Sequence, residues 1–146
     1  MYYVKQMLQK KGTAIWSVTP NTTTSAALKM LADKDVGALL VMDGEQLVGI
    51  ISERDFVRQI AEQGACHLDA PVSEAMTREV ITIPPTYTIE ECMALMTARR
   101  FRHLPVVEEL RVVGIISIGD VEKSAIENKE DAIDNLERYI RGDGRS

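Results

Sequence analysis

The residues best suited to chemistry form a short block that occurs twice, Gly-Ile-Ile-Ser-x-x-Asp. It runs from Gly49 to Asp55 and again from Gly114 to Asp120. A carboxylate offers two acceptor oxygens, which suits the adjacent hydroxyls of a ribose. A serine hydroxyl and the amides of a helix N-terminus can hold a phosphate. Glycine inside a strand is unfavourable unless another group must approach the backbone there. The block therefore indicates a site for a sugar phosphate.

The same side chains have a simpler interpretation. Ser52 and Asp55, like Ser117 and Asp120, stand where they could cap a helix. For one copy alone, capping would be the better explanation. Two copies, each following the same kind of strand, favour ligand binding, and the two roles are compatible.

A basic cluster lies just before an expected strand. Arg99 and Arg100 suit a solvated helix end, where cations favour the helix dipole. Arg102 and His103 fall where the chain turns into the strand, so they could point into a cleft and meet a phosphate. His67 has no such neighbours and is interpreted as a loop residue.

An internal repeat shows where these residues lie relative to the expected strands and helices. Residues 15–60, shifted by 65 positions, fall on residues 80–125 without a gap, and Val48-Gly49-Ile50-Ile51-Ser52 matches Val113-Gly114-Ile115-Ile116-Ser117. The chain is a tandem duplication. This spacing is too long for a solenoid and favours two half-domains related by a pseudo-twofold axis.

Each half is expected to form strand, helix, strand, strand, helix. The expected strands are residues 15–18, 38–42, 47–51, 80–83, 103–107 and 112–116. We expect Thr24-Ser25 to cap one helix, and Thr88 with Glu91 to cap its copy as a capping box. Further helices are expected at residues 55–62, closed by Gly64, and from residue 120 onward. Residues 1–14 and 71–76 are lead-in segments, and residues 65–73 connect the halves.

Residues 121–141 are expected to form one long charged helix. Ile126, Ile133 and Ile140, with Leu136, follow one stripe at heptad-like spacing. The stripe could pack on the chain's own core or against a second copy in a dimer.

Composition narrows the function. With 146 residues and 45% hydrophobic content the chain can bury a core, whereas its net charge of −5 and pI near 5.1 argue against nucleic acid as the main partner. No apolar run reaches the ~20 residues that cross a bilayer, and the start lacks the layout of a signal peptide. Cys66 and Cys92 have no metal-ligand spacing, so we expect free thiols, no metal site and a cytoplasmic protein, with Cys92 in a helix core.

Two copies of Gly-h-h-Ser-x-x-Asp (h, apolar), each preceded by strand-helix-strand, resemble a pair of cystathionine-β-synthase (CBS) domains, also called a Bateman module. Arg102-His103-Leu104-Pro105-Val106 is similar to a common strand motif of that family, and Met76-Thr77 to its lead-in. The resemblance implies an α+β fold of two βαββα units with a cleft on each side. It divides the chain into residues 4–64, residues 71–126 and a C-terminal helix and tail at 127–146.

In that family the clefts bind adenosine compounds, which here implies AMP, ADP, ATP, NAD or S-adenosylmethionine as ligand, with no obligatory cofactor. Asp55 and Asp120 would hold ribose, and strand backbone would meet the adenine edge. The second cleft is expected to comprise Val80, Ile81, Thr82, Arg102, His103, Leu104, Pro105, Ser117 and Asp120. The first is expected to comprise Ala14, Ile15, Trp16, Ser17, Gly37, Ala38, Leu39, Ser52, Arg54 and Asp55.

The two copies differ at basic positions. Gly37-Ala38 replaces Arg102-His103, and Arg54 replaces Gly119. We therefore expect unequal clefts, the second being the better mononucleotide site, with Arg54 reaching toward a shared phosphate.

The favoured function is a stand-alone regulatory module that signals through a homodimer or an unidentified target protein. A dimerisation scaffold with empty clefts is the alternative. A nucleotide-acting enzyme is disfavoured, because His103 near Ser117 is the only candidate catalytic pair.

Overall fold

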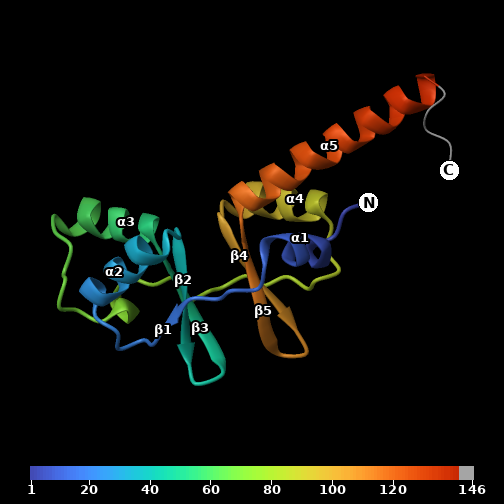
Figure 1. Ribbon diagram of the computed structural model, residues 1–146. Helices are drawn as coiled ribbons and strands as arrows, with labels where there is room; N and C mark the ends of the chain where they lie inside the picture. Colours follow the sequence, from blue (N-terminus) through green and yellow to red (C-terminus); the bar gives the residue numbers. More distant parts are fainter. Residues whose placement is uncertain (142–146) are drawn as a thin grey trace.

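The computed structural model describes residues 1–141. The chain folds into two similar units that lie side by side (Figure 1). The elements in chain order are α1 (Val4–Lys11), β1 (Ser17–Val18), α2 (Thr24–Lys34), β2 (Ala38–Asp43), β3 (Gln46–Ser52), α3 (Glu53–Gln63), the 3-10 helix η1 (Val72–Glu74), α4 (Ile89–Arg99), β4 (His103–Glu108), β5 (Arg111–Ser117) and α5 (Ile118–Arg141). The mixed α+β architecture confirms the fold class that the family resemblance implies.

The strand register repeats between the units. β2 pairs antiparallel with β3 and β4 with β5, and both hairpins have a register shift at the same relative position, after Val41 and after Val106. β1 runs parallel to β2 but is only two residues long, shorter than predicted. The strand predicted at residues 80–83 is reduced to one parallel bridge between Ile83 and Val106. Both segments are shortened at their beginning, whereas their ends, before Pro20 and Pro84, are kept.

The helix caps follow the predictions with one correction. Thr23, and not Thr24-Ser25, caps α2, because its hydroxyl accepts the Ala26 N–H at 3.2 Å. Thr24 is the first helical residue, and its buried hydroxyl donates to the Ala70 carbonyl. Thr88 and Glu91 form the predicted capping box, and Gly64 ends α3 in the left-handed conformation.

The lead-in segments are exchanged between the units. Val4, Met7 and Leu8 of α1 pack in the core of the second unit with Cys92 of α4. Val72 of η1 packs in the core of the first unit. A third apolar cluster, built on Ala38, Leu40 and Ile50 with Val80, Val112 and Ile115 against them, contains residues of both units. Each unit is therefore completed by the segment that precedes the other.

This exchange explains the repeated glycine of the sequence block. A Cβ on Gly49 would lie 2.7 Å from the Met76 sulfur, and one on Gly114 would lie 2.7 Å from a methyl carbon of Leu8. The group that approaches each strand backbone is thus the exchanged lead-in segment and not a ligand.

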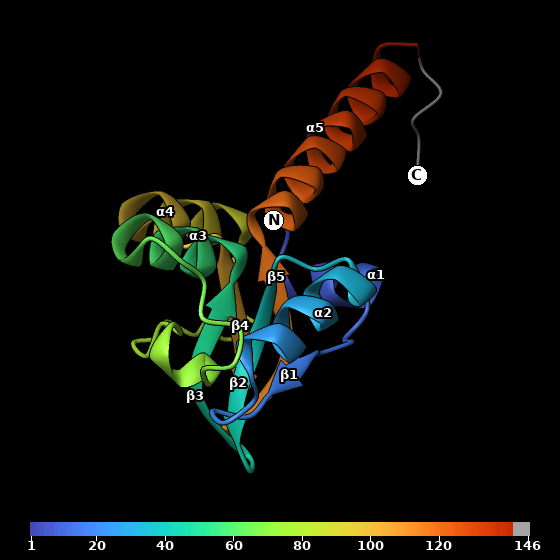
Figure 2. The same cartoon turned by 90° about the vertical axis from the view of Figure 1, so that its left-hand side faces the viewer.

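The helix α5 leaves the body of the molecule. Val121 and Ser124 are buried, whereas Ile126, Ile133, Leu136 and Ile140 are each more than half exposed. In Figures 1 and 2 the second half of α5 projects away from both units. The apolar stripe therefore does not pack on the chain's own core. Within residues 1–141, no helix is both long and apolar enough to cross a bilayer.

Candidate functional site

A cavity of about 480 Å³ lies between the N-terminus of α3 and the segment that joins α4 to β4. We call it the central cavity. It is lined by residues of both units, namely Gly37, Ile50, Ser52, Glu53, Arg54, Asp55, Arg58, Thr77, Arg99, Arg100, Phe101, Arg102 and His103. Because α3 begins directly after β3, the Ser-x-x-Asp block of the first unit faces the basic segment of the second.

Asp55 is the acidic centre of this cavity. Its Oδ2 accepts the Ser52 N–H at 2.8 Å and the Ser52 hydroxyl at 3.0 Å, while its Oδ1 accepts the Thr77 hydroxyl at 3.0 Å. Arg58 lies 3.5 Å from Oδ1. The side chain of Asp55 is 4% exposed. Ser52 and Asp55 therefore do cap α3, and a sugar hydroxyl would reach Asp55 by replacing the Thr77 hydroxyl.

The rest of the cavity is strongly basic. Among the described residues that line it are five arginines and one histidine, against the carboxylates of Glu53 and Asp55. Because the chain as a whole has a net charge of −5, this local concentration of positive charge indicates a binding site for an anion. Arginine presents a fork of donors that matches phosphate oxygens. The arrangement can hold a ligand with a sugar next to one or more phosphates.

His103 lies at the junction of the two units. Its Nε2 would be 3.2 Å from a Cβ built on Gly37. Burial lowers the pKa of His103, and the charges of Lys11 and Arg102 lower it further, while Asp120 and Asp55 act in the opposite direction. The imidazole is therefore neutral at pH 7, where one ring nitrogen can donate to a phosphate.

The second Ser-x-x-Asp block has different neighbours. Ser117 and Asp120 do not line the central cavity. The Asp120 carboxylate accepts the Ser117 N–H at 2.8 Å and pairs with the Lys11 ammonium at 2.5 Å. The Asp120 N–H donates to the Ser117 hydroxyl at 3.1 Å, so this block also caps its helix.

The structure groups the predicted site residues differently from the sequence analysis. The sequence predicts Arg102 and His103 in one cleft with Ser117 and Asp120, but in the structure they line the central cavity with Ser52, Arg54 and Asp55. The pseudo-twofold packing causes this, because it turns the end of α4 in one unit toward the start of α3 in the other. Gly37 of the first cleft lines the same cavity.

Several predicted wall residues are core residues. Leu39 and Leu104 are fully buried, Ala38 is buried between the units, and Pro105 is buried within β4. Ile81 packs partly buried against the core of the second unit. Ala14 and Trp16 are exposed, and the Lys34 ammonium lies 4.2 Å from the Trp16 ring centre. A period-two strand pattern identifies buried positions but not which of them face a cavity.

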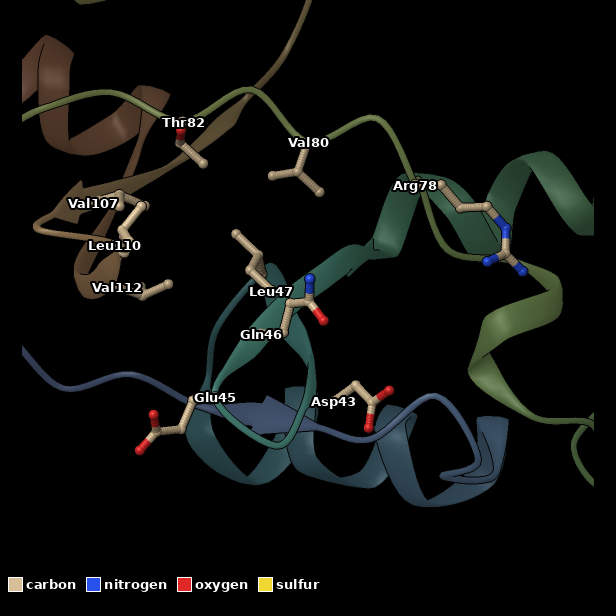
Figure 3. Close-up of a pocket in the computed structure, with 10 residues that line it drawn as sticks. All are labelled: Asp43, Glu45, Gln46, Leu47, Arg78, Val80, Thr82, Val107, Leu110 and Val112. Carbon is tan, nitrogen blue, oxygen red and sulfur yellow. The ribbon is translucent and has the colours of Figure 1, made fainter.

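The remaining predicted residues line two other cavities, between the hairpins. Val80 and Thr82 line one of about 600 Å³, and Ile15 and Ser17 line one of about 390 Å³. In Figure 3, Leu47 of the first unit points toward Val80 of the second across the larger cavity. The two cavities are equivalent under the pseudo-twofold relation, and each is lined by residues of both units.

Sequence reasoning missed Lys11, Arg58 and Thr77 as site residues. Thr77 follows Met76 in a segment that resembles the lead-in of the family. This resemblance is the signal by which the sequence could have pointed to Thr77. Arg58 lies one helical turn after Asp55, a spacing that places both on one face. No local pattern in the sequence links Lys11 to Asp120, because the two are 109 residues apart.

Comparison with known proteins identifies the fold family. The CBS domain profile matches residues 12–62 and 72–127. The mitochondrial CBS domain-containing protein CBSX3 of Arabidopsis thaliana is 38% identical over 136 residues, covering 90% of this chain and 66% of that protein. The crystal structure of the CBS-domain containing protein ATU1752 from Agrobacterium tumefaciens is 41% identical, with a TM-score of 0.81, covering 84% of this chain and 98% of that one.

Two more distant structures contain adenosine compounds. The structure of CBSX2 in complex with AMP is 26% identical to this chain, with a TM-score of 0.70. The match covers 88% of this chain and 99% of that one. The CBS domain pair of MJ0100, in complex with 5′-methylthioadenosine and S-adenosyl-L-methionine, is 25% identical, with a TM-score of 0.73 and coverage of 88% and 98%. Together with the exchanged lead-ins and the repeated hairpins, these matches show that the chain belongs to the CBS domain family and contains two CBS domains.

Proposed function

We propose that the chain is a regulatory module that binds an adenosine nucleotide in the central cavity. The observation that carries this proposal is the concentration of arginines opposite Ser52 and Asp55 in an acidic protein. The AMP complex of CBSX2 and the S-adenosylmethionine complex of MJ0100 support adenosine as the common element of the ligand.

The charges favour a ligand with more than one phosphate. The ribose would hydrogen-bond to Asp55, and the phosphates would extend toward Arg54, Arg100 and Arg102. Each added phosphate adds negative charge and acceptor oxygens for these donors. We therefore expect ATP and ADP to bind more tightly than AMP, and S-adenosylmethionine, which has no phosphate, to bind less tightly than all three. NAD is the remaining candidate.

Isothermal titration calorimetry with AMP, ADP, ATP, NAD and S-adenosylmethionine tests this proposal. Arg102→Gln should weaken ATP binding by about tenfold or more, because a hydrogen bond to a charged group is worth about 1.5–3 kcal/mol. The same change should leave S-adenosylmethionine binding unaltered.

Arg111→Gln is the matched control, because Arg111 lines a different cavity, between the hairpins. Absence of binding by all five compounds would overturn the proposal and favour a dimerisation scaffold. Equal weakening by Arg102→Gln and Arg111→Gln would show that general charge, and not this cavity, attracts the nucleotide.

We further propose that α5 joins two copies of the chain as a parallel pair of helices. Ile126, Ile133 and Ile140 recur every seven residues, and Leu136 lies between the last two on the same stripe. These side chains are exposed by 56–74%. The α5 helix of a second copy would cover these apolar side chains. The resulting helix pair would transmit rearrangements of one module to the other.

The charges beside the stripe favour the parallel arrangement. In a parallel pair, Glu130 and Glu137 would lie opposite Ala125 and Ala132 of the second copy, whereas in an antiparallel pair the glutamates would face each other. Lys129, on the stripe itself, would lie opposite Lys129 of the second copy and beside its Glu130, whose carboxylate would offset the like charges.

Sedimentation velocity tests the dimer. Ile133→Asp should shift the protein from dimer to monomer, because it places a charge in the apolar contact. Asn135→Asp adds the same charge outside the stripe and should leave the dimer intact. A monomeric wild-type protein, or equal dissociation by both variants, would refute this assembly.

We propose regulation rather than catalysis as the output. His103 and Ser117 are neighbours across β4 and β5, but the Ser117 hydroxyl accepts a helix amide. Nucleotide hydrolysis abolished by His103→Asn would reverse this conclusion. A cytoplasmic location stays a prediction.

A further inference from the structure

The two lead-in segments differ in length between equivalent anchor points. Val4 N–H donates to the Tyr87 carbonyl just as Val72 N–H donates to the Thr22 carbonyl of the other unit. Leu8 packs against Gly114 as Met76 packs against Gly49. Six residues then separate Leu8 from Ile15, but only three separate Met76 from Val80. The extra three residues nearly equal one helical turn and extend α1 to Lys11.

This extra turn carries Lys11 onto the second Ser-x-x-Asp block. The Lys11 ammonium donates to Asp120 Oδ2 at 2.5 Å and to the Ile115 carbonyl at 2.7 Å. The side chains of Lys11 and Asp120 are 34% and 25% exposed, so water screens the pair only partly. Burial by itself would raise the pKa of Asp120, but hydrogen bonds from Lys11 and Ser117 outweigh it and lower the pKa.

At Asp55 the closer partner is neutral, and the charged one, Arg58, lies 3.5 Å from Oδ1 with its side chain 60% exposed. There the Thr77 hydroxyl donates to the carboxylate at 3.0 Å. A hydroxyl can rotate and also accept, so it can join a hydrogen-bond network with a ribose. An ammonium has donors only and cannot accept from a ribose hydroxyl. A ribose at Asp120 would have to separate the short ion pair with Lys11. At Asp55 it would replace the neutral hydrogen bond from Thr77 and could leave the longer, more exposed Arg58 contact in place.

We infer that Lys11 is a specificity-determining residue that closes the Asp120 site to ribose. The chain then binds one nucleoside at Asp55 and does not bind a second at Asp120, although both blocks have the same sequence signature. This inference rests on the proposed nucleotide function, and it assigns a single site to each chain.

The same lysine pair links the closed site to the projecting helix. Lys10, next to Lys11, pairs with Glu127 at 3.4 Å, seven residues beyond Asp120 on α5. Because Lys10 and Lys11 both hold α5, Lys11 fixes α1 against the base of that helix while it closes the site.

The test is the number of ATP molecules bound per chain, measured by calorimetry. The wild type should bind one. Lys11→Met keeps the aliphatic part of the side chain but removes the ammonium, and it should add a second site whose affinity is about tenfold or more above any residual wild-type binding there. Lys11→Arg should keep the site closed. Lys10→Ala, the neighbouring control, should bind one.

Asp55→Asn separates the two claims, because it disables the first site alone. The double variant Lys11→Met, Asp55→Asn should still bind one ATP, at Asp120. If the wild type binds two, or if Lys11→Met binds only one as the wild type does, the inference fails and the proposed function stands. If Lys11→Met binds none while Lys10→Ala binds one, Lys11 is a ligand contact and the inference fails.

If the wild type binds none and Lys11→Met binds one, the proposed site at Asp55 fails, while the claim that Lys11 closes the Asp120 site stands. Absence of binding by every variant overturns both.

Discussion

The imidazole of His103 in the second unit lies directly against the backbone of Gly37 in the first, so that a Cβ at position 37 would be 3.2 Å from Nε2. Gly37 and Arg102 are equivalent in the repeat, as are Ala38 and His103. The two units can therefore meet at this point only because one has small residues where the other has large basic ones. The asymmetry that places positive charge in the central cavity is also what permits the close packing.

A side chain at position 37 should disturb the cavity. Gly37→Val should displace the His103 ring and lower ATP affinity by about tenfold, since ~1.4 kcal/mol of lost contact corresponds to that factor. Calorimetry measures the affinity. Gly119→Ala is the control, because its Cβ would meet the Ser117 hydroxyl at an ordinary 3.6 Å. Unchanged ATP binding by Gly37→Val would show that the position of the His103 ring does not matter for the ligand.

The stability of the fold should depend on pH through His103. Burial, followed by the Lys11 charge, lowers the pKa of this group below its ordinary value of 6.5. The folded state then binds fewer protons than the unfolded chain, so the free energy of unfolding falls as pH drops from about 6.5 through the folded pKa. One proton limits the slope to about 1.4 kcal/mol per pH unit.

Urea denaturation at pH 7.5 and 5.5 measures this effect. His103→Asn should reduce the difference between the two pH values, and His67→Asn, at the exposed second histidine, should not. An equal pH dependence in wild type and His103→Asn would rule out this source. The pKa of Asp120 is also lowered, but that group loses its contribution below about pH 4, outside this range.

The two strand glycines should resist substitution. Gly49→Ala and Gly114→Ala each place a Cβ within 2.7 Å of the exchanged lead-in segment, and such overpacking costs about 1–3 kcal/mol. Gly49→Ala should be the more damaging, because its Cβ would also lie 3.0 Å from the Thr77 carbonyl, which is backbone. Thermal denaturation ranks the two variants. The reverse order would mean that the Leu8 side chain is the less adaptable neighbour.

The two thiols should differ in reactivity. Burial raises the pKa of Cys92 to about 11, and Glu91 and Glu90 act in the same direction. Because the thiolate is the reactive form, Cys92 should not react with Ellman's reagent at pH 8 in the folded protein. Cys66 is only half-buried and should react first. Titration of one thiol in the native protein and two in urea would agree with this, and rapid reaction of both in the native protein would contradict it.

Much of the fold follows from local patterns in the sequence. The repeat, the hairpins, the Thr88 capping box, the Gly64 helix end and the long α5 depend on residues close together in the chain, whose spacing carries the information. The same holds for the types of residue in the site, because a doubled Ser-x-x-Asp block and a basic segment can be seen without knowing where they lie.

Tertiary structure decided which of these residues meet. The pseudo-twofold packing brought His103 and Arg102 to the Ser-x-x-Asp block of the other unit, and the exchange of lead-ins brought Lys11 to Asp120. Both contacts join segments far apart in sequence, and no periodicity within either segment specifies its partner. The two sites differ both at substituted repeat positions, where Arg102 and His103 stand against Gly37 and Ala38, and through three additional residues before the first repeat, which extend α1 by nearly one turn.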